Sequence, residues 1–259
     1  MKKRWQILAN YGLWTVLVLA LLVSLSFVAD EQKQMRCQSL DVQILPESGT
    51  YFITREDVVR EITGGRGEAI LLGEPVAMFN VGQLEDALEL NSFVQDAEVF
   101  IDIEGNLRVD VTQRRPIVRI MRQDGSGYYI DEHGVKMPLS DSFTAHVPIA
   151  TGNIYEKIEH AKDTVFSRVG RDIYNMAVYL DKNPFWKAMV DQIEITSKSE
   201  LVFIPKIADH KVVLGDASNL EQKLAHLKVF YKKGLNKLGW DKYKVINLKY
   251  TGQIVCEKY

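Results

Sequence analysis

Residues 7–29 form an uninterrupted run of 23 residues without a charged side chain, preceded by the basic residues Lys2, Lys3 and Arg4. At ~1.5 Å per residue, a helix of this length spans the ~30 Å hydrocarbon core of a bilayer. The basic flank favours a cytoplasmic N-terminus. The sequence therefore predicts a cytoplasmic tail over residues 1–6, a single transmembrane helix over 7–29, and export of everything that follows.

A cleaved signal peptide is the alternative interpretation of this run. Its length exceeds that of a usual signal-peptide core, and no A-x-A cleavage site follows, so an uncleaved anchor is favoured. A lipoprotein is disfavoured because Met35 and Arg36, which precede Cys37, do not form a lipobox. Cys37 and Cys256 lie at opposite ends of the exported part, and the sequence leaves open whether they form a disulfide or stay as two thiols.

The charge of the exported part argues against general nucleic-acid binding. Without the three basic residues of the tail, 29 of the 32 lysines and arginines remain against 34 acidic residues, which gives a net charge of −5. A nucleic-acid binder normally carries a basic surface instead.

Residues 99–116 alternate between apolar and polar side chains, a pattern typical of two half-buried strands. We expect a three-residue turn at 104–106, with Asn106 in the left-handed conformation. This turn sets Ile103 opposite Leu107 and, further from the turn, Ile101 opposite Val109. A slip of one residue would turn every apolar side chain to the solvent.

Two helices are expected between a first strand at 40–45 and this hairpin. Thr54 with Asp57, and Asn80 with Gln83, have the spacing of helix-capping residues. After a linker at 30–37, residues 38–115 are therefore expected to form a β-α-α-β-β module.

The remainder, residues 116–259, is expected to form a β-rich domain with two amphipathic helices, so the predicted fold class is α+β. The first helix is expected over 164–182, with Phe166 on its apolar face. Asp216 or Ser218 is expected to cap the second. The chain should close on a pair of strands within residues 244–259.

No pattern of catalytic or metal-binding residues stands out. Asp131, Glu132 and His133 are neighbours in a D-x-x-G turn, and the five histidines have no H-E-x-x-H spacing. The glycines at 64–67 lack the Lys-Ser/Thr of a phosphate-binding loop. We expect no catalytic residue, no metal and no cofactor, and no small-molecule substrate; an envelope enzyme such as a wall hydrolase is correspondingly disfavoured.

Taken together, the order of segments resembles that of the bacterial cell-division protein family FtsQ, also called DivIB. The segments that carry the resemblance are "FITREDVV" at 52–59, "LRVDVTQRRPIVRI" at 107–120, "GYYIDEHGVKMPL" at 127–139, "HVPIATG" at 146–152 and "INLKY" at 246–250. One departure is Gln113, where the family often has Glu before its "RRP".

The resemblance implies a POTRA domain over 38–115, and a β-domain over 116–259 that receives a strand from small single-span division proteins of the FtsB/DivIC and FtsL type. It places the chain in the bacterial inner membrane at the division septum, with its bulk in the periplasm, as a non-enzymatic scaffold of septal wall synthesis.

The resemblance also places partner docking on the last strands of the chain. We expect a terminal strand to be an exposed edge, which suits strand addition. The expected partner-binding residues are those of the segment 246–252: Ile246, Asn247, Leu248, Lys249, Tyr250, Thr251 and Gly252. This segment is expected to be a terminal strand bent at Gly252, with Lys249 and Tyr250 on opposite faces.

Three further interpretations stay open. Arg114, Arg115 and Pro116 could form a second partner site or a hinge, or only a solvated strand end. The eight lysines from Lys223 to Lys249 could face an acidic partner or only the solvent. A POTRA-type component of export or outer-membrane protein assembly is the alternative function.

Overall fold

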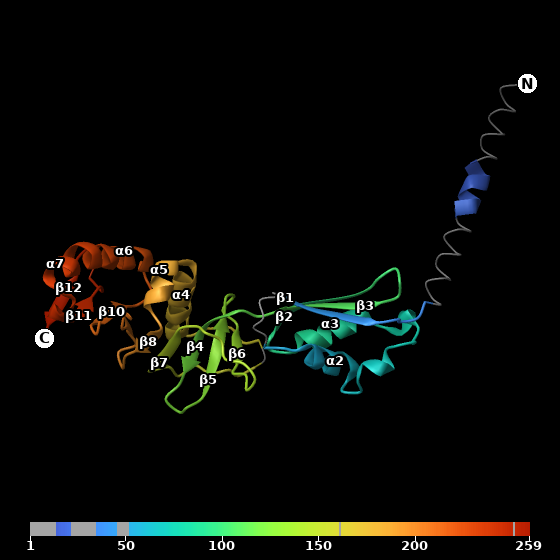
Figure 1. The fold of residues 1–259 in the computed structure, drawn as a ribbon, viewed down its shortest axis with the longest axis horizontal. Helices are drawn as coiled ribbons and strands as arrows, with labels where there is room; N and C mark the ends of the chain where they lie inside the picture. The colour runs from blue at the N-terminus through green and yellow to red at the C-terminus, as the bar shows by residue number, and fades with distance from the viewer. Residues whose placement is uncertain (1–13, 22–34, 46–51, 161, 251) are drawn as a thin grey trace, which may run out of the picture. The chain divides into compact units, whose positions relative to one another are not determined.

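The computed structural model describes residues 14–21, 35–45, 52–160, 162–250 and 252–259. They belong to two units: residues 1–49 with 53–113, and residues 50–52 with 114–259. Figure 1 shows the elements of each unit.

Residues 14–21 are helical and exposed, whereas the rest of the expected transmembrane helix, 7–13 and 22–29, lies outside the described residues. Among the described residues, none of the helices has the length and apolar character needed to cross a membrane.

The first unit packs two helices on one face of a three-stranded sheet (Figure 1). The sheet has the order β1-β3-β2, with β1 parallel and β2 antiparallel to the central strand β3. The elements are β1 (Leu40–Leu45), α2 (Arg55–Thr63), the short 3-10 turns η1 (Glu68–Ile70) and η2 (Val76–Met78), α3 (Val81–Glu89), β2 (Val94–Ile101) and β3 (Leu107–Gln113). The predicted β-α-α-β-β order is confirmed.

Both predicted caps of this unit are confirmed. The Thr54 side chain accepts from the Asp57 N–H at 3.2 Å, and the Asp57 carboxylate accepts from the Thr54 N–H at 2.9 Å. Asn80 accepts from the Gln83 N–H at 3.3 Å. These bonds satisfy backbone donors that the first turn of a helix leaves without an intrahelical partner.

The predicted register of the hairpin is wrong by two residues. Ile101, not Ile103, lies opposite Leu107, and Val99 lies opposite Val109. The apolar faces stay the same, because side chains repeat every two residues along a strand. Ile103 falls in the turn and is 93% exposed.

The turn itself explains the shift. The Asp102 carboxylate accepts hydrogen bonds from the backbone N–H groups of Glu104 and Asn106, both at 2.9 Å, and from the Asn106 side chain at 3.0 Å. Gly105, at φ +86°, takes the left-handed conformation that was expected of Asn106. A turn closed by Asp102 needs all the residues from 102 to 106, so Ile103 cannot join the strand.

The second unit is built on a nine-stranded sheet of the described residues, with the order β12-β11-β10-β9-β8-β7-β4-β5-β6. Its strands are β4 (Pro116–Met121), β5 (Gly127–Asp131), β6 (Lys136–Pro138), β7 (Ile149–Gly152), β8 (Gln192–Ile195), β9 (Leu201–Phe203), β10 (Lys211–Gly215), β11 (Tyr243–Asn247) and β12 (Val255–Lys258). Its helices are α4 (Arg168–Lys182), α5 (Pro184–Met189), α6 (Leu220–Phe230), a π turn η3 (Tyr231–Leu235), α7 (Asn236–Leu238) and a 3-10 turn η4 (Trp240–Lys242). Figure 1 shows α4, α5 and α6 on one side of this sheet.

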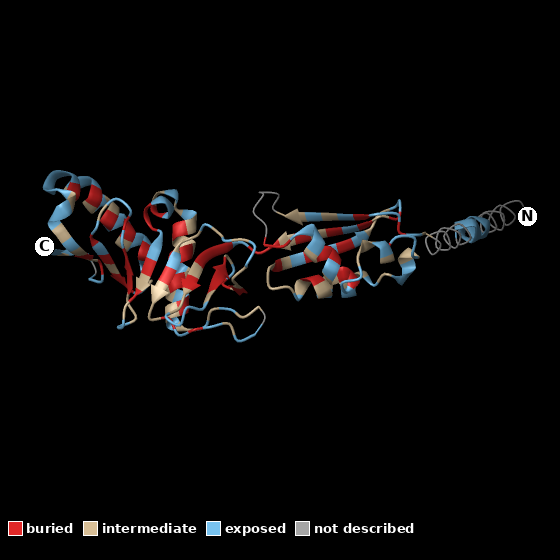
Figure 2. Ribbon diagram, turned by 60° about the horizontal axis from the view of Figure 1, so that its bottom comes forward, coloured by how far each residue is buried: buried red, intermediate tan, exposed pale blue. Residues whose placement is uncertain are grey.

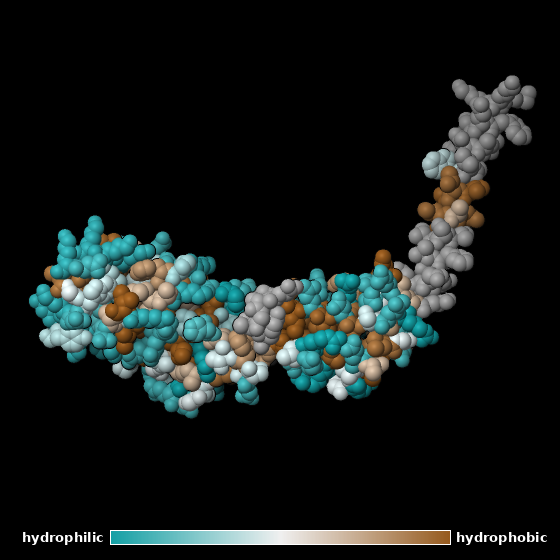
Figure 3. Space-filling model, in the orientation of Figure 1, coloured by the Kyte–Doolittle hydropathy of each residue, from teal (hydrophilic) through white to brown (hydrophobic). Residues whose placement is uncertain are grey.

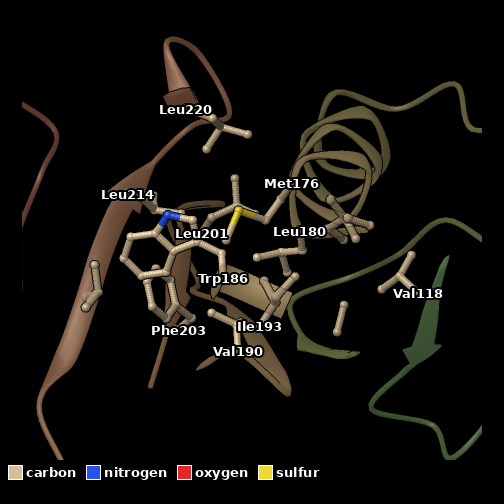
Figure 4. Close-up of a cluster of buried hydrophobic side chains, with 14 of the residues drawn as sticks. Val118, Met176, Leu180, Trp186, Val190, Ile193, Leu201, Phe203, Leu214 and Leu220 are labelled. Carbon is tan, nitrogen blue, oxygen red and sulfur yellow. The ribbon is translucent and has the colours of Figure 1, made fainter. Parts of the chain in front are cut away.

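The core of this unit lies between the sheet and these helices. Trp186 is 1% exposed and stands at its centre, among Met176 and Leu180 of α4 and Leu201 and Phe203 of β9 (Figure 4). Figure 2 shows buried residues concentrated in the strands and along one side of the helices. The α+β class, with a β-rich second domain, is confirmed.

The predicted beginnings of the two long helices are wrong. The first helix starts at Arg168 rather than at 164, because the Ser167 hydroxyl caps it by accepting from the Gly170 N–H at 2.9 Å. Phe166 therefore lies outside the helix and is 59% exposed. Asn219, at φ +52° and without a side-chain cap, precedes α6, while Asp216 accepts from the Ser218 N–H in the preceding turn.

Candidate partner-binding edge

The sheet of the second unit ends in two edge strands, β6 and β12. An uncovered edge strand offers backbone N–H and C=O groups to another chain, whereas a covered edge does not. Within this unit, the two edges therefore decide where strand addition can occur.

The β6 edge is covered by the chain itself. Lys136 donates its N–H to the Asp163 carbonyl at 2.6 Å, and Val165 donates to the Gly134 carbonyl at 3.0 Å. Val135 and Thr164 form an isolated bridge. These bonds occupy the N–H of Lys136 and the C=O of Gly134 at the start of this edge, and Pro138 at its end has no N–H to offer a partner strand.

A buried ion pair holds this covering segment. The Lys136 ammonium lies 3.0 Å from the Glu156 carboxylate, and the two side chains are 0% and 1% exposed. The Glu156 carboxylate also accepts from the backbone N–H groups of Phe166 at 3.0 Å and Ser167 at 3.2 Å, and from the Ser167 hydroxyl. A buried charge is tolerated only when it is paired and hydrogen-bonded, as both charges are here.

The β12 edge is open among the described residues, since β12 pairs only with β11. Val255, Glu257 and Lys258 are exposed, and Cys256 is partly buried. A strand of a partner chain would therefore meet a free backbone here.

The orientation of the β12 peptide groups follows from its neighbours. Leu248 donates its N–H to the Val213 carbonyl of β10 at 2.8 Å. The backbone groups of successive residues in a strand point to opposite sides. The backbone groups of Ile246 therefore face β10, as those of Leu248 do, whereas the backbone groups of Val245 and Asn247 face β12.

The pairing then fixes the open side of β12. Val245 lies opposite Glu257, and Asn247 lies opposite Val255. Glu257 and Val255 therefore bond inward, to β11. The N–H and C=O of Cys256, between them, point away from β11 to the open edge.

The segment that the sequence singled out, 246–252, is next to this edge but does not form it. Ile246 and Asn247 belong to β11, a strand inside the sheet, and Ile246 is 0% exposed. Leu248 is 4% exposed. These buried positions leave little side-chain surface for a partner.

The expected continuation of this strand through Lys249 and Tyr250 is wrong. Both residues lie in a loop after β11, where they do not alternate between two faces of a sheet. The physical reason is the Asn247 side chain, whose oxygen accepts the Lys249 N–H at 3.0 Å and closes a turn at the end of β11. The bend expected at Gly252 is observed, with a φ of +76°.

The side chains of this loop differ in their contacts and in their exposure to solvent. The Lys249 ammonium lies 2.9 Å from the Glu200 carboxylate, a contact that raises the pKa of Lys249. Tyr250 is 51% exposed. Thr251 lies outside the described residues. Their role in binding stays a prediction, with Tyr250 the side chain most available to a partner.

The loop and the beginning of α6 line a small, partly open hollow beside the open edge. Four residues of the expected segment line it, together with residues that the sequence did not single out. The lining residues are Asn219, Gln222, Lys223, His226, Leu248, Lys249, Tyr250, Gly252, Gln253 and Ile254.

The edge residues 255–258 were also missed as site residues. The signal was present, because these residues close the predicted terminal strand pair. What the sequence lacks is the order of strands, which places β11 inside the sheet and leaves β12 at its end.

Arg114 and Arg115, at the start of the second unit, form ion pairs within that unit. The Arg114 guanidinium lies 2.8 Å from the Asp131 carboxylate, and the two side chains are 7% and 0% exposed. Arg115 lies 2.7 Å from Glu132 and 2.8 Å from Asp181. A solvated strand end is therefore wrong for Arg114, and Pro116 begins β4.

The D-x-x-G turn behaves as the sequence predicts. The Asp131 carboxylate accepts from the His133 N–H at 2.9 Å and the Val135 N–H at 2.8 Å. Within the described part of the chain, no three His, Cys, Asp or Glu side chains are grouped as a metal site would need.

Comparison with known protein families gives one match for each unit. A family described as "FtsQ/DivIB, C-terminal related" matches residues 115–257. A "POTRA-like domain" family matches residues 35–112. No curated protein matches the chain.

Proposed function

Because the chain belongs to the FtsQ/DivIB C-terminal related family and carries a POTRA-like domain, we propose that it is a membrane-anchored scaffold of the bacterial division machinery. Both families are typically non-enzymatic. The proposed partners are small single-span division proteins of the FtsB/DivIC and FtsL type, which would add a strand to β12.

The open edge of β12 is the observation that carries this proposal. Strand addition takes its affinity from backbone pairing and its selectivity from side chains beside the new strand. The N–H and C=O of Cys256 supply the backbone groups, and Tyr250 and the neighbouring hollow supply side-chain contacts.

The proposed location follows from the sequence. The uncharged run at 7–29 and its basic flank favour an anchor in the inner membrane, with the N-terminus in the cytoplasm and the bulk in the periplasm at the septum. A component of export or outer-membrane protein assembly is less favoured, because one POTRA-like match is followed by the FtsQ/DivIB-related one.

Co-purification tests the proposal. The full-length protein is expressed with FtsB/DivIC-type and FtsL-type proteins of the same organism, and the complexes are isolated in detergent. Recovery of both partners supports the proposed function. Recovery of neither, from a protein that is folded and present in the membrane, contradicts it.

A further inference from the structure

Three exposed apolar side chains gather on two loops at one end of the first unit. Ile103, at the tip of the β2–β3 hairpin, is 93% exposed. Met78 in η2 is 72% exposed, and Leu72 before it is 43% exposed. In Figure 3, hydrophobic atoms protrude at the hairpin end of this unit.

Both loops bind the segment through which the chain enters the unit. From the hairpin, the Gly105 carbonyl accepts from the Gln38 N–H at 3.1 Å. From the other loop, Val76 donates to the Met35 carbonyl at 3.0 Å, and Gly73 donates to the Cys37 carbonyl at 2.8 Å. The two loops that carry the three apolar side chains therefore flank the point where the chain enters the unit at residue 35.

This point lies close to the proposed membrane anchor. Residue 35 follows the last residue of the uncharged run, residue 29, by only a short stretch of chain. A fully extended chain of this length reaches at most about 20 Å. The hairpin end of the first unit must then lie within that distance of the bilayer.

We propose that Ile103, Met78 and Leu72 form a membrane-contacting surface that seats the first unit on the lipid interface. This inference rests on the proposed anchor and goes beyond partner binding. Apolar side chains that reach the boundary between headgroups and acyl chains bind it through the area they bury. Glu74 and Glu104 are exposed on the same loops, and the exposed Arg36 donates to the Gly73 carbonyl at 2.7 Å. Charges of both signs lie here, so the proposed contact rests on the apolar side chains.

Leu90 provides a matched control within the same unit. It is 76% exposed, comparable to Met78. It lies just before the beginning of β2, whose other end leads into the hairpin. The length of this strand separates its two ends by about 24 Å.

The test uses the full-length protein with Cys256→Ser, reconstituted in vesicles of phosphatidylethanolamine and phosphatidylglycerol. Cysteines introduced by Ile103→Cys, Met78→Cys or Leu90→Cys carry an environment-sensitive fluorophore, and lipids with a quencher at the acyl boundary are added. Cys37 is 2% exposed, and the Cys256→Ser protein alone measures its residual labelling. A label introduced by Leu19→Cys reports insertion of the anchor.

We expect quenching at Ile103 and Met78 to exceed that at Leu90 at least about twofold, because interfacial side chains lie within about 5–10 Å of the acyl boundary. The difference should persist in high salt. Quenching at Leu19 but equal, weak quenching at the other three positions overturns the membrane contact while the anchor stands. No quenching at Leu19 overturns the anchor and the contact together.

Discussion

Ile101 lies directly opposite Leu107 across the β2–β3 hairpin, with the turn closed by Asp102 between them. Leu107 is 0% exposed and Ile103 is 93% exposed. The sequence pattern would pair Leu107 with Ile103, yet one is buried and the other is exposed. Substitutions at these two positions therefore distinguish the observed register from the predicted one.

The first prediction compares these two positions. Leu107→Ala should lower the free energy of unfolding of the first unit by ~2–5 kcal/mol, because it removes a fully buried side chain. Ile103→Ala should change it by less than about 0.5 kcal/mol. Hydrogen exchange of the β3 amides at increasing denaturant concentration measures the free energy of unfolding of both variants. Equal losses would mean that Ile103 is paired and the observed register is wrong.

The second prediction concerns Asp102 and the stability of the first unit at low pH. Hydrogen bonds from Asn106 and Glu104, and the contact with Arg108, lower the pKa of Asp102 to about 2. Since this pKa lies below the unfolded value of ~3.9, the carboxylate stabilises the unit above pH ~4 and loses this effect as the pH falls toward 2.

Asp102→Ala should therefore lower the melting temperature at neutral pH and flatten its dependence on pH between about 4 and 2. Glu104→Ala, in the same turn, is the matched control. Thermal melts across this range would contradict the prediction if both variants kept the pH dependence of the parent.

The third prediction concerns the covered edge. Lys136→Met should destabilise the second unit by ~3–5 kcal/mol, because it leaves the buried Glu156 carboxylate without its cation. Adding Glu156→Leu should restore part of this loss. Because the single variant loosens the segment over β6, it should also associate with itself as concentration rises, whereas the double variant should do so less. Denaturant unfolding and light scattering measure the two effects; a single variant as stable as the parent would contradict the role of the pair.

The fourth prediction concerns His210, which is 1% exposed and bonded to the Tyr231 hydroxyl at 2.8 Å. Burial lowers the pKa of His210 below its usual value. The unfolded chain then binds a proton more readily than the folded one, so stability falls as the pH drops below ~6.5.

His210→Gln should reduce the loss of stability between about pH 7 and 5. His226 is exposed, so His226→Gln is the matched control for replacing a histidine outside the core. Denaturant unfolding at several pH values decides this. Identical pH profiles for the parent and His210→Gln would exclude the buried histidine as the cause.

Several local features could be predicted from the sequence, whereas the strand order of the second unit could not. The caps at Thr54 and Asn80 and the strand Leu40–Leu45 depend on neighbouring residues, and all three are observed. The prediction of the hairpin register was wrong because the Asp102 carboxylate accepts several hydrogen bonds within one turn. The alternation of apolar and polar residues does not reveal such a turn. The sequence did not identify β12 as the edge strand, because that position depends on β11 pairing in parallel with β10.

The central claim is that a partner strand pairs with the open side of β12, where the N–H of Cys256 faces outward. Cys256→Pro removes this donor, and Cys256→Ser removes the thiol but keeps the donor. Glu257→Pro, which removes a bond inside the sheet, shows the effect of damage to the domain itself. Melting curves identify which variants remain folded.

The most direct measurement is the affinity of the full-length protein, in detergent, for the FtsB/DivIC-type partner. We predict that Cys256→Pro weakens binding about tenfold or more while the protein stays folded, since it removes an inter-chain hydrogen bond and obstructs the added strand. Cys256→Ser should bind like the parent. A folded Cys256→Pro protein that binds as tightly as the parent would contradict strand addition at β12.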